Sequence, residues 1–196
     1  MFEQRIHQHF IDSADLKYQA AEALAPPIAR AVEAIWTAVT NDCKVLVCGN
    51  GGSAADAQHF VANFVSRYER ERPELAALAL TTNTSILTAI GNDYSYRDVF
   101  AKQVRALGQA GDVLLAISTS GNSESILTAI EAAHSREMAV VALTGKGGGK
   151  VNELLGELDI HICVPSDRTA RIQEVHILAL HCICDGVDAM LLGDAE

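Results

Sequence analysis

Two short loops combine glycine, amide and hydroxyl residues at the start of a predicted helix. The first is Gly49-Asn50-Gly51-Gly52-Ser53 and the second is Ser118-Thr119-Ser120-Gly121-Asn122-Ser123. Backbone N–H groups at a helix N-terminus, with the positive end of the helix dipole, can bind a phosphate without a lysine. The absence of Lys and Arg from both loops is therefore not evidence against an anionic ligand. The alternative is that both loops are only tight turns capped by serine.

The first loop also fits a dinucleotide-binding fingerprint, as Gly49-x-Gly51-x-x-Ala54. That fingerprint needs an acidic residue after the second strand to bind the ribose hydroxyls. The second predicted strand is followed by Thr81-Thr82-Asn83, which contains no acid. A dinucleotide also leaves the second hydroxyl loop without a role, so this alternative is disfavoured.

A third glycine-rich segment, Thr144-Gly145-Lys146-Gly147-Gly148-Gly149, follows another predicted strand. Three consecutive glycines indicate a flexible turn, from which Lys146 could approach a ligand.

The elements that must position these loops alternate between short apolar runs and helical patterns. Continuous apolar runs are typical of parallel strands that are covered on both faces. The predicted strands are Lys44–Cys48, Leu75–Leu80, Asp112–Ile117, Met138–Leu143 and Ile160–Val164. The predicted helices between them are Ser53–Glu69, Ser85–Ile90, Tyr96–Leu107, Ser123–His134 and Val151–Leu155. The pattern predicts a doubly wound α/β fold with a five-stranded parallel sheet, in which ligands bind beyond the carboxyl ends of the strands.

Helices are also predicted at both ends of the sheet segment. Residues 4–41 read as two helices broken at Pro26-Pro27, and a long helix covers Arg168–Leu192. The long C-terminal helix is apolar on more than one side, which indicates that other surfaces cover it. We therefore expect the chain to associate with copies of itself through its terminal helices.

Length and composition fit one domain of 196 residues, 49% of them hydrophobic, with a net charge of −10. It would comprise a helical arm (about 1–41), a sheet core (about 44–164) and a C-terminal helix (about 168–192). The charge, and the absence of a basic run, argue against direct binding to nucleic acid. No signal peptide or apolar run long enough to span a membrane is present, so a cytoplasmic protein is expected. The five cysteines fit reduced, buried thiols.

Four motifs in order resemble the SIS (sugar isomerase) domain family. They are the two loops above, Gly91-Asn92-Asp93 and Arg171-Ile172-Gln173-Glu174-Val175-His176. Within that family the chain looks like the phosphoheptose isomerases and their relative, the DnaA initiator-associating protein. The resemblance implies a homotetramer. It also implies conversion of sedoheptulose 7-phosphate to D-glycero-D-manno-heptose 7-phosphate, at the start of lipopolysaccharide core heptose synthesis.

The resemblance also implies roles for individual residues. The expected ligand-binding residues are Asn50, Gly51, Gly52, Ser53, Asn92, Asp93, Ser118, Thr119, Ser120, Ser123 and Gln173. A zinc ion would be held by His59, Gln173 and His181, and His181 would act as catalytic acid or base. Helical spacing allows each pair, His59 with Asn63 and Gln173 with His181, to face one pocket.

One position departs from the isomerase pattern. Isomerases have a glutamate four residues after the first histidine as metal ligand and base, whereas this chain has Asn63. An amide can be a weak fourth ligand, but it has no titrating proton at neutral pH and cannot act as a base. Glu174 is the nearest alternative acid in sequence, rotated by about 100° from Gln173. The second hypothesis is therefore a non-catalytic scaffold that binds DnaA.

The remaining candidates have ordinary structural interpretations. His181 and His176 lie in apolar sequence and could be hydrogen-bonded core residues. The alternating charges of Arg67–Arg72 predict a solvated helix end or a subunit contact. The other histidines, His7, His9, His134 and His161, are expected at the surface or in packing roles.

Overall fold

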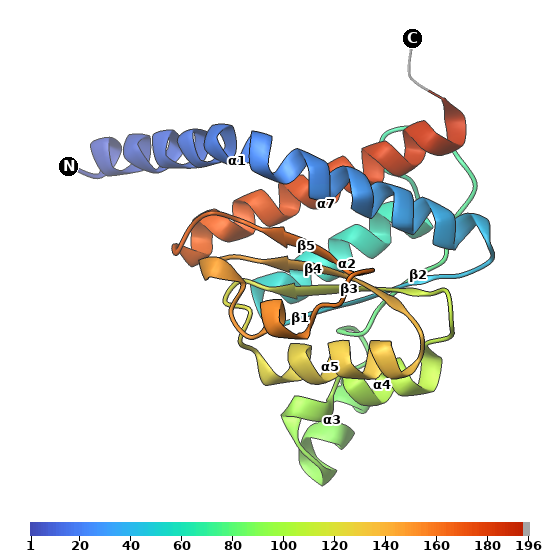
Figure 1. The fold of residues 1–196 in the computed structure, drawn as a ribbon. Helices are drawn as coiled ribbons and strands as arrows, with labels where there is room; N and C mark the ends of the chain where they lie inside the picture. Colours follow the sequence, from blue (N-terminus) through green and yellow to red (C-terminus); the bar gives the residue numbers. More distant parts are fainter. Residues whose placement is uncertain (194–196) are drawn as a thin grey trace.

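A computed structural model describes residues 1–193 and shows a five-stranded parallel sheet at the centre of the chain (Figure 1). The strand order is β2-β1-β3-β4-β5, with every neighbouring pair parallel. The strands are β1 (Val45–Gly49), β2 (Ala77–Ala79), β3 (Val113–Ser118), β4 (Ala139–Thr144) and β5 (Ile160–Cys163). All five predicted strands are present, so the predicted α/β fold class is confirmed.

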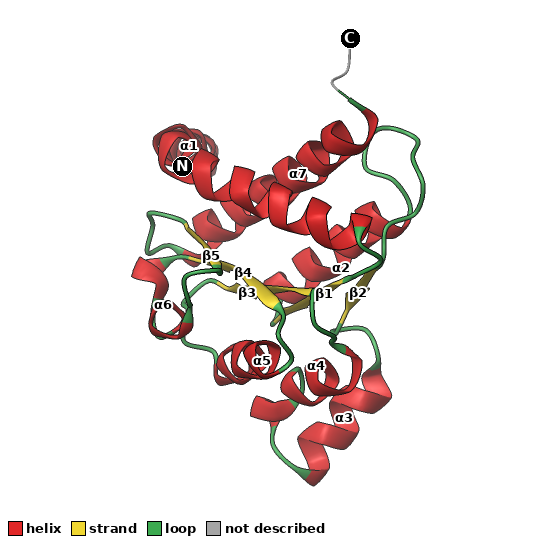
Figure 2. Cartoon of the chain, turned by 45° about the vertical axis from the view of Figure 1, so that its right-hand side comes forward, coloured by secondary structure: helices red, strands yellow, loops and turns green. Residues whose placement is uncertain are grey.

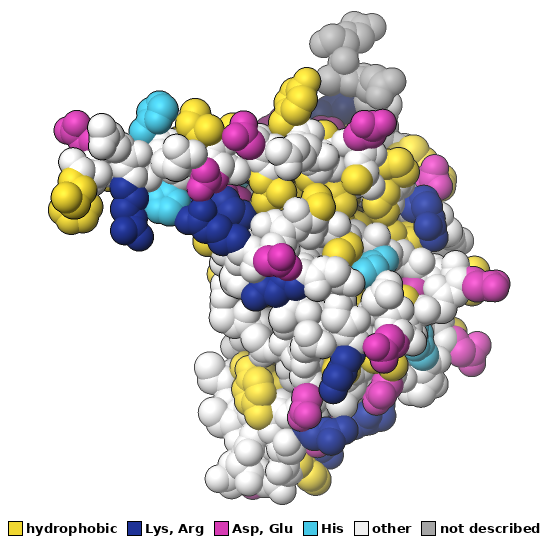
Figure 3. Space-filling view, turned by 60° about the vertical axis from the view of Figure 1, so that its left-hand side comes forward, with side chains coloured by type: hydrophobic (Ala, Val, Ile, Leu, Met, Phe, Trp, Pro, Cys, Tyr) yellow, Lys and Arg dark blue, Asp and Glu magenta, His cyan; other side chains and the backbone are white. Residues whose placement is uncertain are grey.

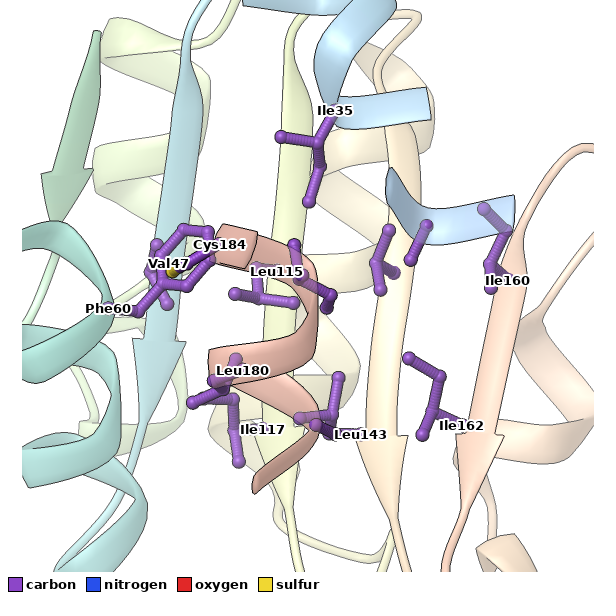
Figure 4. Close-up of a cluster of buried hydrophobic side chains, with 14 of the residues drawn as sticks. Ile35, Val47, Phe60, Leu115, Ile117, Leu143, Ile160, Ile162, Leu180 and Cys184 are labelled. Carbon is purple, nitrogen blue, oxygen red and sulfur yellow. The ribbon is translucent and has the colours of Figure 1, made fainter. Parts of the chain in front are cut away.

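The central strands are buried on both faces because helices cover the sheet on each side. In β3, for example, Val113 and Leu115 belong to one buried cluster, while Leu114 and Ala116 belong to the other. Figure 4 shows the first cluster, in which side chains of the sheet meet Phe60 and helix residues. Two buried faces explain why the strands read as continuous apolar runs rather than as alternating ones.

The helices form one layer on each face of the sheet (Figure 2). Helices α1, α2 and α7 lie on one side, and α3, α4 and α5 lie on the other. Their bounds are α1 (Phe2–Thr40), α2 (Gly52–Val65), α3 (Thr84–Asp93), α4 (Ala101–Leu107), α5 (Glu124–Ser135), α6 (Val151–Leu154) and α7 (Thr169–Leu192), with short 3-10 helices η1 (Tyr96–Asp98) and η2 (Lys146–Gly148).

The predicted break at Pro26-Pro27 is wrong, because α1 is a single helix that contains both prolines. Prolines in a helix interior remove backbone hydrogen bonds and usually break the helix. Here Leu24, before the prolines, and Ile35, after them, are buried in the same cluster against the sheet and α7. Burial on both sides of the prolines therefore favours continuing the helix.

Two other predicted boundaries differ from the structure. Strand β2 is shorter than predicted because it pairs only with Val45–Val47 of β1 and lies at the sheet edge. The predicted helix Tyr96–Leu107 is divided into η1 and α4. The division follows from Ser95, whose hydroxyl accepts a hydrogen bond from the Arg97 amide and begins the short turn.

All five cysteines are free, but the expectation that they are buried holds for only two of them. Cys48 and Cys184 are buried, whereas Cys43 and Cys163 are half-buried and Cys182 is exposed. Burial raises the pKa of the Cys48 thiol to about 12, so this group stays protonated at neutral pH.

Helix α7 is long and apolar enough, by length and composition, to meet the criterion for a membrane span. Its inner side is instead buried in the core with β-sheet and α1 residues. It also carries two buried polar side chains, His176 and Asp188, each of which is bonded to another part of the chain. These contacts identify α7 as a core helix.

We expect His176 to make folding stability depend on pH. Its Nε2 lies 2.9 Å from the Thr144 carbonyl oxygen, and burial lowers its pKa from 6.5 to about 4. As the pH falls, the unfolded chain therefore takes up a proton at His176 before the folded chain does. The contribution of the neutral, buried His176 to the free energy of unfolding is complete above pH 6.5 and is lost as the pH falls toward 4. Between pH 7.5 and 5 the loss is about 2 kcal/mol.

Urea denaturation of the wild type and of His176→Asn measures this effect. The difference in unfolding free energy between the wild type and His176→Asn should be about 2 kcal/mol smaller at pH 5 than at pH 7.5. For the control Gln4→Ala, which lies on the exposed part of α1 and has no titratable group, the difference from wild type should not change with pH. A constant difference for His176→Asn would contradict the prediction.

Candidate functional site

The first glycine loop is closely packed at the carboxyl end of β1. Gly51 has a φ of 57°, a conformation that favours glycine, and α2 begins directly after it. At Gly52, a Cβ atom would collide with the side-chain amide of Gln173. Glycine at this position therefore lets the loop lie directly against the Gln173 side chain of α7, which would otherwise have to move. Ser53 follows as a buried residue.

The hydroxyl loop connects β3 to α5. Ser118 donates a hydrogen bond to Ser123 Oγ over 3.3 Å, and Ser120 Oγ accepts one from the Asn122 amide over 3.2 Å. Ser123 is the N-cap residue of α5, but its side chain makes no capping hydrogen bond. Thr119 completes the loop and is half-buried. The first-turn amides of α5 therefore remain without a side-chain cap and are suited to an anion.

The third glycine segment supports the hydroxyl loop, a role that its sequence did not indicate. Gly121 has a φ of 64°, and a Cβ on it would collide with the Gly148 carbonyl. The Val151 amide donates to the Gly121 carbonyl over 3.0 Å. The Lys150 amide donates to Asn122 Oδ1 over 3.1 Å. The predicted flexible turn is thus packed against its neighbour, while Lys146 is exposed.

Asn50, in the first loop, is bonded at both ends of its side-chain amide. Asn50 Nδ2 donates to Ser125 Oγ over 3.0 Å, and Tyr96 Oη donates to Asn50 Oδ1 over 2.8 Å. A pocket of about 350 Å³ opens beside these bonds. Its lining residues are Asn50, Ser95, Tyr96, Arg97, Ser123, Glu124 and Ser125.

No sequence motif marks five of the residues that line this pocket, and they were not predicted: Ser95, Tyr96, Arg97, Glu124 and Ser125. The predicted Asn92 and Asp93 lie at the exposed end of α3, where the Asn92 amide donates to Asp93 Oδ1 over 2.8 Å. Within residues 1–193, no hydrogen bond joins this pair to either loop.

A pair of histidines brings α2 and α7 together. His59 Nε2 lies 2.9 Å from His181 Nε2, and Asn63 Nδ2 lies 3.2 Å from the same His59 nitrogen. The Tyr68 ring lies 5.6 Å from the His181 ring, centroid to centroid. Burial, and then the charge of His59, lower the pKa of His181, which favours a neutral imidazole.

Gln173 does not join this group in the structure. Its amide packs against Gly52, which precedes His59 by about two helical turns on α2. The two convergent imidazole nitrogens suit zinc, which binds histidine readily. Among the described residues, no cluster of three or more His, Cys, Asp and Glu side chains surrounds a possible metal position. The possible metal donors at this position are thus two imidazoles and one nearby amide.

Arg72 fixes the end of α2 that carries Asn63. Its guanidinium pairs with Asp188 of α7 over 2.8 Å and donates to the carbonyls of Asn63 and Phe64 over 2.6 and 2.7 Å. Arg72 is buried, so the predicted exposure of the stretch Arg67–Arg72 to solvent is wrong for Arg72. It holds for exposed neighbours such as the Arg67–Glu71 pair. The buried ion pair therefore sets the position of Asn63 relative to α7.

One carboxylate near the histidine pair was not singled out from the sequence. Asp56 shares a face of α2 with Gly52, His59 and Asn63, and its Oδ2 is buried without a hydrogen-bond partner. Burial raises the pKa of Asp56, and the charge of His59 opposes that shift. Glu174, the alternative acid, is instead paired with Arg171 over 2.6 Å.

The remaining histidines have packing or surface roles. His134 bonds to Asp159 over 2.8 Å, and His161 bonds to the Thr144 hydroxyl over 2.7 Å. His9 lies 2.9 Å from an Arg168 side-chain nitrogen, and His7 is exposed. These positions agree with the roles expected from the sequence.

The fold, the two loops at one sheet edge and the family comparison define the class of protein. Residues 8–145 match the SIS domain family, and the chain belongs to that family. Over its full length it is 64% identical to the phosphoheptose isomerase of Methylibium petroleiphilum, covering 98% of that protein.

Two solved structures are also similar over nearly the whole chain. The phosphoheptose isomerase of Neisseria gonorrhoeae is 52% identical, with a TM-score of 0.92, and the match covers 96% of this chain and 100% of that one. For the enzyme of Francisella tularensis the identity is 47% and the TM-score 0.93, with 96% and 98% coverage.

We predict that Gly121→Ala destabilises the protein by about 2–3 kcal/mol and weakens phosphate binding. The added methyl group meets the Gly148 carbonyl and also strains a positive φ, so the hydroxyl loop must move. Gly147→Ala is the matched control, because its φ of 74° is also positive but no atom lies near the new Cβ. Its cost should be about 1 kcal/mol, from backbone strain alone. Thermal unfolding and calorimetry with inorganic phosphate measure both effects; equal results for the two variants would contradict the prediction.

Proposed function

We propose that this chain is a phosphoheptose isomerase that converts sedoheptulose 7-phosphate to D-glycero-D-manno-heptose 7-phosphate in the cytoplasm. The observation that carries the proposal is the hydroxyl loop, which opens α5 without a side-chain cap and is supported by the third glycine segment. Such a loop suits a phosphate held by amides and hydroxyls. Full-length similarity to proteins named phosphoheptose isomerases supports the same function.

The reaction moves a carbonyl group from C2 to C1 through an enediol. A base removes a proton from C1, the electron pair forms the C1–C2 double bond, and the C2 oxygen accepts a proton. A proton donor then returns a proton to C2 of the enediol, and the C1 hydroxyl gives up its proton as the carbonyl forms at C1. The site must therefore supply a proton acceptor, a proton donor and stabilisation of developing negative charge.

His181 is the group that we assign to proton transfer. Its lowered pKa leaves the imidazole neutral near pH 7, with a lone pair able to accept a proton in the metal-free chain. The two loops would hold the phosphate and the sugar at the carboxyl edge of the sheet. Asn63 can donate or accept hydrogen bonds there but does not titrate.

We propose zinc as the metal, held by His59 and His181, with Asn63 supplying an amide oxygen; Gln173, expected as a further ligand, lies against Gly52 instead. When bound, zinc would stabilise negative charge on a sugar oxygen. All three of these donor groups are neutral in their binding form, so none of them is a carboxylate that would strengthen metal binding.

We expect the wild-type chain to convert sedoheptulose 7-phosphate and Asn63→Glu to raise kcat by at least about tenfold. Glutamate would place a titrating carboxylate beside His59, whereas the control Asn63→Gln keeps an amide. Conversion is measured with and without added zinc. Activity no greater than that of buffer in both the wild type and Asn63→Glu would overturn the isomerase proposal.

The second candidate function is a non-catalytic scaffold that binds DnaA, and Asn63 is the observation that favours it. The names of the similar proteins favour the isomerase instead. A chain without turnover that captures purified DnaA would support the scaffold.

We further propose that the chain forms a homotetramer. The first part of α1 extends beyond the body of the molecule (Figure 3), and Phe2, Ile6 and Phe10 recur every four residues along it with 56–77% exposure. An apolar groove of about 380 Å³ lies between α1 and α7, lined in part by Leu24, Leu178 and Ala179. Apolar surface of this extent is typical of an interface between subunits.

Light scattering should give a mass of four 20.9 kDa chains. Replacing Ile6 and Phe10 together by Glu should shift the mass to smaller species, because each charge would be buried in the interface. Leu158→Glu is the control, since Leu158 is 88% exposed in the loop before β5. A wild-type monomer, or an unchanged mass in the double variant, would contradict the interface.

A further inference from the structure

The amide of Asn50 is held by two side chains from different elements. Tyr96 donates from η1 to Asn50 Oδ1 over 2.8 Å, and Ser125 accepts from Asn50 Nδ2 in the first turn of α5 over 3.0 Å. Ser125 is only 4% exposed. A bond at each end of the amide prevents it from rotating about its side-chain torsions.

The segment that carries Tyr96 is itself anchored on both sides. Before it, the Ser95 hydroxyl accepts from the Arg97 amide over 3.3 Å. Beyond it, the buried Thr128 hydroxyl of α5 donates to the Arg97 carbonyl. Tyr96 therefore reaches Asn50 from a fixed backbone, although its ring is 58% exposed.

The two bonds leave the amide with one free N–H and one free carbonyl lone pair. Both lie beside the pocket of about 350 Å³, next to Ser123 of the hydroxyl loop. A fixed donor and acceptor side by side can bond to two neighbouring hydroxyls of a sugar, each of which both donates and accepts. An amide free to rotate would lose part of that binding energy to ordering.

We propose that Tyr96 is a positioning residue that holds Asn50 in the orientation that binds the sugar part of a sugar phosphate. The inference rests on the proposed sugar-phosphate function and adds a residue to it. In this proposal the hydroxyl loop binds the phosphate, and Asn50, held in place by Tyr96, binds the sugar hydroxyls.

Tyr96→Phe tests this role because it removes only the hydroxyl. We expect its Kd for sedoheptulose 7-phosphate to rise about fivefold, the effect of one ordinary hydrogen bond. Its Kd for inorganic phosphate should stay within about twofold of the wild-type value. In the isomerase assay, KM should rise more than kcat falls. Ser125→Ala should reproduce the pattern from the other end of the amide.

Tyr94→Phe is the matched control. Tyr94 is also exposed and lies two residues away, but its ring faces the Lys102 ammonium at 3.5 Å. It should bind both ligands as the wild type does. Equal binding of sedoheptulose 7-phosphate by Tyr96→Phe and Tyr94→Phe would overturn the inference, as would an equal loss for phosphate and sugar phosphate. A wild type that binds phosphate but shows no preference for the sugar phosphate would instead overturn the proposed function.

Discussion

The site depends on the close approach of backbone segments at the carboxyl edge of the sheet. A Cβ on Gly121 would collide with the Gly148 carbonyl, so no side chain fits there, and a Cβ on Gly52 would displace the side-chain amide of Gln173. This contact brings peptide groups and hydroxyls from three loops to one edge. The loops carry only Lys146 as a charged residue, so the field there comes chiefly from oriented dipoles.

A second constraint links the helices that carry the candidate catalytic groups. Arg72 bonds to the last carbonyls of α2 and to Asp188 on α7. The imidazoles of His59 and His181 meet farther along the same contact. Because these groups lie on packed helices rather than on loops, their relative positions follow from the core itself. The polar contact between α2 and α7 is thus part of the fold as well as of the site.

Much of the architecture could be predicted because buried parallel strands leave a clear sequence signal. The loops were recognisable because their residues are contiguous. The hydrogen bond between Tyr96 and Asn50 could not be recognised from the sequence, since it joins residues 46 positions apart that share no motif. The continuity of α1 through Pro26 and Pro27 was also missed, because core burial outweighs local helix propensity there.

The net negative charge of the chain has a kinetic consequence for the proposed phosphate ligand. A phosphorylated sugar approaches a protein of net charge −10, so long-range electrostatics repel it before short-range dipoles can bind it. Ionic strength then acts in the unusual direction: added salt screens the repulsion and speeds the encounter. The dipoles that hold the bound anion act within a few ångströms and are screened far less.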